Sequence, residues 1–271
     1  MSHSTPPSEK DVLARRKARF WETTDYDRAF RGTFGRYMTD IEWAALDRVA
    51  SAHDSPLWLD LGCGHGRFLA HFAPRAGRLV GLDFSGRLLA IASRQLAERS
   101  LPRPTGLVRA SADLIPLEGD SIDVVSCVRV VQHVPDQDEA FREIFRVLRP
   151  GGDLLLVQYN FLSPHGFIRA LKLPVKASLR AIIRASGREP AFDEPTRWTW
   201  WPTLRAQLEG IGFSVERGTG AWLFPLQYFR SKSTNNAWPG AHGLAWVYEK
   251  LADTAPFKYL GGYMIVRCRK P

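Results

Sequence analysis

The residues best suited to chemistry begin at Asp60, an acid inside a short apolar stretch, and continue into three alternating glycines, Gly62, Gly64 and Gly66. Glycine has no Cβ and adopts positive φ readily, so such a turn leaves backbone N–H groups open to a ligand. The apolar residues of 57–61 predict a buried strand before the turn, and helical spacing predicts a helix after it. Together, a strand, a glycine turn and a helix N-terminus predict a ligand site.

The ligand of this turn is either a dinucleotide or another small molecule. The dinucleotide fingerprint requires a third glycine three residues after the second one. In this chain the second glycine is Gly64, and the residue three positions later is Arg67. The Asp60 carboxylate would also repel a pyrophosphate. The spacing therefore disfavours a dinucleotide, and an ordinary strand-to-helix turn that binds nothing is the alternative.

Two further acids follow predicted strands. Asp83 ends the apolar stretch 78–83 and lies 17 residues after Gly66, close to the offset at which a strand-end carboxylate meets a ribose. Asp113 lies in the loop after the predicted strand 105–110. A carboxylate can accept hydrogen bonds from both ribose hydroxyls, so Asp83 predicts a ligand that contains a ribose.

The elements that must position these acids alternate between strands and helices. Apolar runs predict strands at 57–61, 78–83, 105–110, 120–127, 153–157, from 213 to 215 and at 262–268. Ser85 and Asp136 are suited to cap two of the helices between them. The series of alternating strands and helices is typical of a parallel doubly wound sheet in an α/β fold.

In order and spacing, the motifs resemble those of the class I S-adenosylmethionine (SAM) methyltransferases, in the "type 11" small-molecule subgroup. The similar segments are Asp-Leu-Gly-Cys-Gly-His-Gly at 60–66, Asp83, Ala112-Asp113, 120–125, Gln132-His133-Val134 and Arg-Pro-Gly-Gly at 149–152. The resemblance covers about residues 55–160, and weakly 200–215 and 263–269. It implies a Rossmann-like doubly wound sheet of seven strands, mostly parallel with an antiparallel last strand. The subgroup includes enzymes that methylate quinone rings at carbon.

The resemblance also implies SAM as the cofactor and assigns residues to it. SAM carries an ammonium and a sulfonium but no phosphate, which suits Asp60. Phe84 is expected to stack on the adenine, and Asp113 to accept a hydrogen bond from its amino group. The expected cofactor-binding residues are Asp60, Gly62, Cys63, Gly64, Gly66, Asp83, Phe84, Ala112, Asp113, Leu114 and Val128.

The implied reaction is an in-line displacement of a methyl group, for which the protein supplies position and shielding from water. A hydroxyl or enol-like acceptor would gain from a general base. His133 follows the fourth strand, where the sulfonium should lie, and is the first candidate; its alternative role is in the helix-entry turn alone. Tyr159 and His165 are further candidates. No cluster of residues has the spacing of metal ligands, so no metal is expected.

Composition is typical of a globular chain: 45% of the 271 residues are hydrophobic and 24% charged. No run of 18 apolar residues predicts a transmembrane helix, and the first ten residues lack the apolar core of a signal peptide. Three scattered cysteines are too few for a disulfide framework. We therefore expect a cytoplasmic protein with free thiols.

The basic excess lies in the C-terminal part. Residues 161–271 hold 16 Lys and Arg against 7 Asp and Glu, whereas residues 1–160 hold 21 of each. Within this part, residues 164–188 alternate apolar and basic side chains at helical spacing, and Pro174 is expected to break them into two helices. Such a pair can cover the acceptor site as a lid, can contact an anionic membrane peripherally, or is a solvated face packed on the domain.

These observations predict one methyltransferase domain at 11–271 after a disordered tail at 1–10. Its expected parts are a helical N-terminal segment, a core at 50–160, lid helices at 161–195, a final helix and strands at 196–217 and 262–270, and an insertion at 218–261. Six of nine tryptophans lie between Trp198 and Trp246, which suits an apolar or aromatic acceptor or plain packing.

The predicted function is methyl transfer from SAM to a hydrophobic or aromatic small molecule of a natural-product, quinone or envelope pathway. One alternative is an RNA methyltransferase, suggested by the basic C-terminal part. Against it, the chain has no recognisable RNA-binding motif, and nucleic acid is not an expected partner. The other alternative is a scaffold that binds SAM or lipid without turnover. The sequence leaves open the acceptor, the atom methylated and the oligomeric state.

Overall fold

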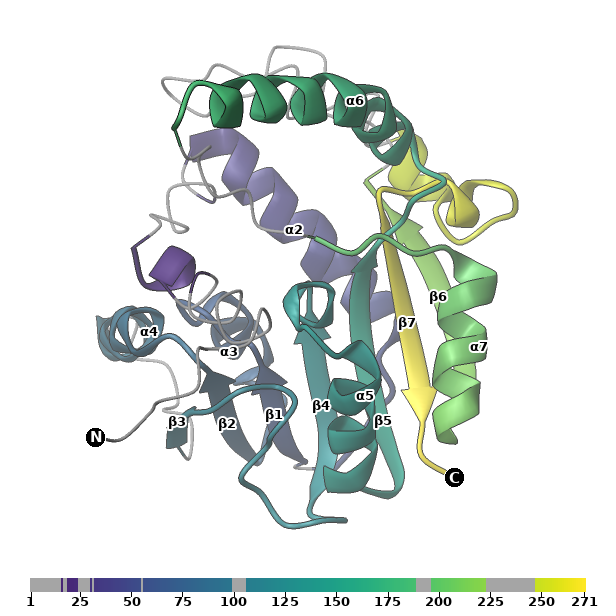
Figure 1. Cartoon of the computed structure of the whole chain (residues 1–271). Helices are drawn as coiled ribbons and strands as arrows, with labels where there is room; N and C mark the ends of the chain where they lie inside the picture. Colours follow the sequence, from purple (N-terminus) through teal and green to yellow (C-terminus); the bar gives the residue numbers. More distant parts are fainter. Residues whose placement is uncertain are drawn as a thin grey trace, which may run out of the picture.

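A seven-stranded sheet forms the centre of the molecule (Figure 1). The computed structural model describes residues 16, 19–23, 30, 32–54, 56–98, 106–188, 196–222 and 247–271. The strands are β1 (Leu57–Leu61), β2 (Arg78–Asp83), β3 (Gly106–Arg109), β4 (Ile122–Val128), β5 (Leu148–Tyr159), β6 (Ser214–Ala221) and β7 (Tyr263–Arg269). Their order is β3-β2-β1-β4-β5-β7-β6, so the direction of winding reverses between β1 and β4.

The sheet is parallel except for β7, which runs antiparallel to both of its neighbours, β5 and β6. The strands at its centre are buried on both faces, which is why they are nearly continuous runs of Leu, Val and Ile. The predicted seven-stranded, mostly parallel sheet with an antiparallel last strand is confirmed.

Helices cover both faces of the sheet (Figure 1). α2 (Gly32–Val49), α3 (Arg67–Phe72) and α4 (Gly86–Glu98) share one apolar core with residues such as Trp58 and Leu155. α5 (Gln137–Val147) and α7 (Trp201–Ile211) share the other core with residues such as Leu59 and Leu156. Because side chains alternate along a strand, neighbouring residues of β1 and β5 serve opposite cores. The expected caps are present: Ser85 Oγ accepts from Leu88 N, and Asp136 Oδ1 from Glu139 N.

Two expectations about residues 148–185 were wrong. β5 begins at Leu148 rather than at Asp153. The residues 149–152 form a bulge within the strand, where the register of β4 with β5 shifts, and Gly151 has a φ of 78°. α6 (Pro164–Ala185) is a single helix that contains Pro174, not two helices. Gly166 is the only buried residue of α6, so the backbone carbonyl that Pro174 deprives of a donor can be hydrated.

Several segments of the predicted domain lie outside the described residues. They include the tail at 1–10, parts of the expected N-terminal helical segment, residues 99–105, residues 189–195 of the expected lid and residues 223–246 of the expected insertion. Within the described ranges, none of the helices combines the length and the apolar character needed to cross a membrane.

Candidate functional site

The turn after β1 holds its three glycines in left-handed conformation. The φ angles are 71° at Gly62, 53° at Gly64 and 87° at Gly66. A Cβ on Gly62 would collide with the Val130 side chain, and a Cβ on Gly66 would lie 3.1 Å from Ala92 Cβ in α4. The backbone conformation therefore favours glycine at all three positions, and close packing also requires it at Gly62 and Gly66.

A cavity of about 320 Å³ opens beside this turn, at the carboxyl ends of β1, β2, β3 and β4. This is the edge of the sheet where the winding reverses, the place at which open α/β sheets bind ligands. Its lining residues are Trp21, Gly62, Gly64, Leu82, Asp83, Phe84, Leu88, Ala110, Ser111, Ala112, Asp113, Val128, Arg129, Val130, His133, Val134 and Pro135.

Asp83 is the acid at the end of β2, and it is 7% exposed in the cavity wall. Its Oδ2 accepts a hydrogen bond from Gly64 N at 2.9 Å, and its Oδ1 accepts one from Ser85 N at 2.9 Å. Burial raises the pKa of Asp83, while these backbone donors act in the opposite direction. Each carboxylate oxygen has a second lone pair, so Asp83 keeps the capacity to accept from a ligand.

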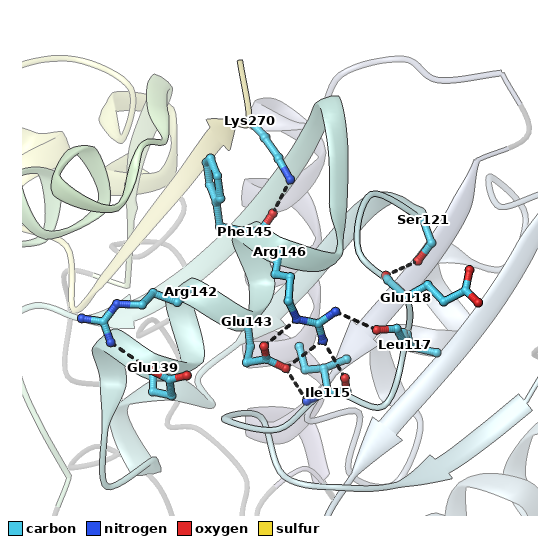
Figure 2. A network of polar contacts seen from close by, with 10 residues as sticks. All are labelled: Ile115, Leu117, Glu118, Ser121, Glu139, Arg142, Glu143, Phe145, Arg146 and Lys270. Atoms are coloured by element: carbon cyan, nitrogen blue, oxygen red, sulfur yellow. Dashed lines mark hydrogen bonds and ion pairs between the residues drawn. The ribbon is translucent and has the colours of Figure 1, made fainter.

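The loop after β3 carries Ala112 and Asp113 into the cavity wall. Further along, the same loop is fastened to α5 through Arg146 (Figure 2). Arg146 Nη2 donates to Ile115 O at 2.8 Å, and Arg146 Nη1 donates to Leu117 O at 2.9 Å. The loop that borders the cavity is therefore held at a point two residues beyond Asp113.

Glu143 completes this attachment (Figure 2). Its Oε2 accepts a hydrogen bond from Ile115 N at 2.8 Å, and its Oε1 accepts one from Arg146 Nε at 2.6 Å. The hydrogen bond from Arg146 lowers the pKa of Glu143. Lys270, near the C-terminus, donates from Nζ to Phe145 O at 2.8 Å and so contacts the same helix.

Asp60 lies beneath the glycine turn rather than in the cavity wall. The side chain is 2% exposed, and its Oδ1 accepts a hydrogen bond from Ser126 Oγ at 2.8 Å. Its Oδ2 is buried and finds no hydrogen-bond donor among the described residues. Burial raises the pKa of Asp60 to about 7, although Ser126 and Arg67 act to lower it.

Arg129 follows β4 with a left-handed φ of 59°, and its side chain is almost fully buried. Arg129 Nε lies 3.0 Å from Glu42 Oε1, and Arg67 Nη1 lies 2.6 Å from Glu42 Oε2. The Phe30 ring packs under both guanidinium groups, at 5.2 Å from that of Arg129 and 4.3 Å from that of Arg67. Glu42 of α2 thus holds Arg129 at the edge of the cavity.

His133 lies in the 3₁₀ turn η2 (Val131–His133) and lines the cavity together with Trp21. The two rings meet edge to face, with centroids 5.3 Å apart. This packing orients the imidazole ring in the cavity wall.

Tyr159 lies outside the cavity wall, in an aromatic cluster made of Tyr159, His165, Trp198, Trp222 and Tyr263. The centroid of the Trp198 ring is 4.7 Å from that of Tyr159 and 5.1 Å from that of His165, and both pairs are stacked. Trp222 stacks on Tyr263 at 5.2 Å. Burial, followed by the charges of Arg169 and Lys172, lowers the pKa of His165 to about 4.

The aromatic cluster adjoins the cavity through one residue. Arg129, which lines the cavity, places its guanidinium carbon 5.6 Å from the centroid of the Tyr263 ring. Its Nη1 is 3.5 Å from the Tyr263 hydroxyl oxygen. The cavity and the cluster are therefore neighbours at the carboxyl ends of β4 and β5.

The structure brings most of the expected site residues together. Those that line the cavity are Gly62, Gly64, Asp83, Phe84, Ala112, Asp113, Val128 and His133. Asp60, Cys63, Gly66, Leu114 and Tyr159 do not line it: Cys63 is buried, whereas the Leu114 side chain is 73% exposed. The role of each of these residues stays a prediction.

Sequence reasoning missed some residues of the cavity wall. Arg129 directly follows Val128, so the rule that ligands bind at strand ends would have included it. Trp21 comes from the N-terminal segment, and no local pattern indicated its contact with His133. The other missed residues are Leu82, Leu88, Ala110, Ser111, Val130, Val134 and Pro135.

None of the three cysteines lines the cavity. Cys63, Cys127 and Cys268 are free and buried, and burial raises the pKa of each thiol. Among the residues that the structure describes, no three His, Cys, Asp or Glu side chains are grouped as metal ligands.

Residues 59–156, from β1 into β5, match a family model described as "Methyltransferase domain". The uncharacterized methyltransferase ML2584 of Mycobacterium leprae is 32% identical over 146 residues, which are 52% of this chain and 53% of that protein. A demethylmenaquinone methyltransferase of Lactococcus lactis is 35% identical over 103 residues, 37% of this chain and 40% of that protein. The chain spans about half the length, or less, of these curated relatives.

Solved structures share the fold over nearly the whole chain. A SAM-dependent methyltransferase of Thermotoga maritima, described as a possible histamine N-methyltransferase, has a TM-score of 0.62 at 18% identity, covering 96% of this chain and 100% of that one. The [4+2]-cyclase SpnF has a TM-score of 0.58 at 18% identity, covering 99% and 98%. At these identities the likeness concerns the fold alone.

Proposed function

We propose that the protein is a class I SAM-dependent methyltransferase of the type 11 group, because residues 59–156 match a family model described as "Methyltransferase domain", and that it methylates a small apolar or aromatic acceptor at the expense of SAM. The observation that carries the proposal is the cavity at the carboxyl ends of β1, β2, β3 and β4, bordered by the glycine turn and by Asp83. We propose the whole described fold as one such domain.

The residues of the cavity fit SAM. The glycine turn leaves open space at Gly64 in the cavity wall, where a ligand can approach the backbone. The buried Asp83 retains lone pairs for two ribose hydroxyls. Phe84 and Asp113 lie in the wall at positions suited to an adenine. Asp60 acts from below the turn, where its partly unsatisfied carboxyl group favours a cationic ligand. Gly62, Gly64, Asp83, Phe84 and Asp113 would hold the cofactor.

SAM, when bound, would supply an electrophilic methyl group: the acceptor atom bonds to the methyl carbon while the bond from that carbon to sulfur breaks, and S-adenosylhomocysteine leaves. The chain supplies position: the loop at 110–117 and the glycine turn orient the ligands, and Trp21 reduces the access of water. His133 is the proposed general base, which takes the proton of a hydroxyl or enol-like acceptor. Tyr159 acts by forming the acceptor surface rather than by proton transfer.

The aromatic cluster supports an apolar or aromatic acceptor. Its stacked rings lie next to Arg129, so the cluster extends the surface of the cavity with further aromatic area that an aromatic acceptor could contact. Relatives named demethylmenaquinone methyltransferase and ubiquinone/menaquinone biosynthesis C-methyltransferase support a quinone-type ring. We also propose a cytoplasmic location, because all three cysteines are free thiols.

The decisive experiment is transfer of an isotopically labelled methyl group. The purified protein is incubated with labelled SAM and fractionated cell extract, and products are identified by mass spectrometry. An Asp83→Ala protein serves as the control for non-enzymatic transfer. Because a [4+2]-cyclase shares this fold, SAM binding without transfer to any fraction would overturn the proposal and favour a non-methylating function.

A further inference from the structure

α6 turns its apolar side toward solvent. Five large apolar residues recur along it at intervals of three or four and therefore share one side: Phe167, Leu171, Val175, Leu179 and Ile182. Each of them is between 56% and 69% exposed. We call this set the apolar row. An amphipathic helix normally buries such a row, so its exposure over the whole helix marks a contact surface.

A basic row runs beside the apolar row. Lys172, Lys176, Arg180 and Arg184 are spaced four residues apart and so occupy one side of α6. Lys172, Lys176 and Arg180 each follow a residue of the apolar row directly, which rotates the basic row by about 100° from it. No Asp or Glu occurs between residues 154 and 188, so the helix itself carries no acid.

α6 is anchored at the edge of the sheet that bears the cavity. Ser163 caps its N-terminus by accepting from Gly166 N at 3.0 Å, and Gly166 packs against the backbone of Phe161. His165 and Arg169 lie against Trp198 of the aromatic cluster, with Arg169 at 5.3 Å from the ring centroid. Figure 1 shows the helix extending from there across the top of the molecule, beyond the ends of β4 and β5.

We propose that α6 binds the surface of an anionic membrane, with the apolar row inserted among the lipids and the basic row at the headgroups. An apolar row flanked by lysines and arginines, on a helix without acids, is the pattern of an interfacial helix. The inference rests on the proposed function and deepens it: the acceptor is an apolar molecule dissolved in the membrane. The anchored end of α6 then faces the aromatic cluster and the cavity.

The charge of α6 decides between a membrane and a second copy of the chain. Two α6 helices packed on each other through their apolar rows would bring their two basic rows close together, and like charges repel. An anionic lipid surface complements both rows at once. A dimer through α6 is therefore kept as an outcome of the test.

The test is sedimentation of the purified full-length protein with vesicles of phosphatidylcholine alone and with about 30% phosphatidylglycerol. We expect binding to the anionic vesicles that weakens as salt rises from about 0.1 M to about 0.5 M. Leu171→Ser with Val175→Ser should lower the partition coefficient about tenfold or more, because both side chains leave the apolar row. Ala177→Ser with Ala181→Ser, on another side of the same exposed helix, is the matched control and should change it little.

A second pair of variants isolates charge. The double variant Lys172→Gln with Lys176→Gln should bind anionic vesicles more weakly and with a smaller salt dependence. Its control is Arg142→Gln with Arg205→Gln, which removes the same charge from α5 and α7 and should bind like the wild type. SAM affinity, measured by calorimetry, should be unchanged in all four variants, which separates this proposal from the proposed function. Absence of binding to anionic vesicles, equal effects of the row variants and their controls, or a dimer that Leu171→Ser with Val175→Ser dissociates would each overturn it.

Discussion

Asp83 Oδ2 accepts a hydrogen bond from the backbone N–H of Gly64 at 2.9 Å, so the acid at the end of β2 is oriented by the glycine turn after β1. Replacing Asp83 by Ala should weaken SAM binding by more than about 1.4 kcal/mol, or tenfold, because two ribose hydroxyls lose their acceptor and the turn loses its support. Calorimetric titration with SAM measures the change.

The control for this variant is Asp47→Ala. Asp47 forms an ion pair with Arg75 on the surface of α2, away from the cavity wall. Its loss should leave SAM affinity within about twofold of the wild type, because exposed ion pairs contribute little. An Asp83→Ala protein with wild-type affinity would refute the assignment of Asp83 to the ribose.

Arg146 should influence SAM affinity without touching the cavity. Its guanidinium holds Ile115 O and Leu117 O, so Arg146→Ala releases the loop that carries Asp113 (Figure 2). We expect SAM affinity to fall by about 1 kcal/mol, roughly fivefold, because binding must then order the loop. Arg142→Ala, on the same helix, removes only an exposed pair with Glu139 and is the matched control. Equal affinities of the two variants would show that the attachment does not shape the site.

His133→Ala should separate cofactor binding from turnover. The ring lines the cavity beside Trp21, and its loss leaves the glycine turn and Asp83 intact. SAM affinity should stay near the wild-type value, while turnover of a hydroxyl or enol-like acceptor falls about a hundredfold. His71→Ala, which removes a half-buried histidine of α3 that pairs with Asp47 and stacks on Trp43 outside the cavity wall, is the control. Turnover near the wild-type rate at every pH would exclude His133 as the base.

Asp60 should make the stability of the unliganded protein depend on pH. Burial raises its pKa from 3.8 to about 7, so the folded state binds this proton more tightly than the unfolded state does. The resulting stabilisation is present below the unfolded pKa and is lost as pH rises through the folded pKa. The free energy of unfolding of the wild type should therefore fall by about 2 kcal/mol through this group between about pH 5 and about pH 7, and the Asp60→Asn protein should lack this fall. Urea unfolding at several pH values measures the difference. Parallel pH profiles would contradict the raised pKa.

The centre of the fold could be predicted because its strands are buried on both faces. The apolar runs at 57–61 and 78–83 coincide with β1 and β2, residue for residue. Pro174 misled the prediction of α6. Proline removes one backbone hydrogen bond and usually ends or kinks a helix, yet α6 continues through it, and the freed carbonyl lies on an exposed helix where water can reach it.

The sequence predicted those residues of the candidate site that lie at the carboxyl ends of strands. Asp83 and Asp113 follow β2 and β3 and therefore meet at one edge of the sheet. Trp21 reaches the cavity through tertiary packing against His133, which no local spacing encodes. Asp60 has the expected place in the chain, yet strand alternation directs its side chain to Ser126 rather than to the cavity.

The three buried thiols have a consequence for the kinds of compound that the protein can tolerate. Quinone-type rings alkylate thiolates, and burial keeps Cys63, Cys127 and Cys268 protonated and covered. Iodoacetamide should leave the mass of the folded protein unchanged and should modify all three cysteines once urea unfolds it, as mass spectrometry would register. An electrophile in the cavity would therefore meet no thiol in its wall, and each thiol elsewhere is buried.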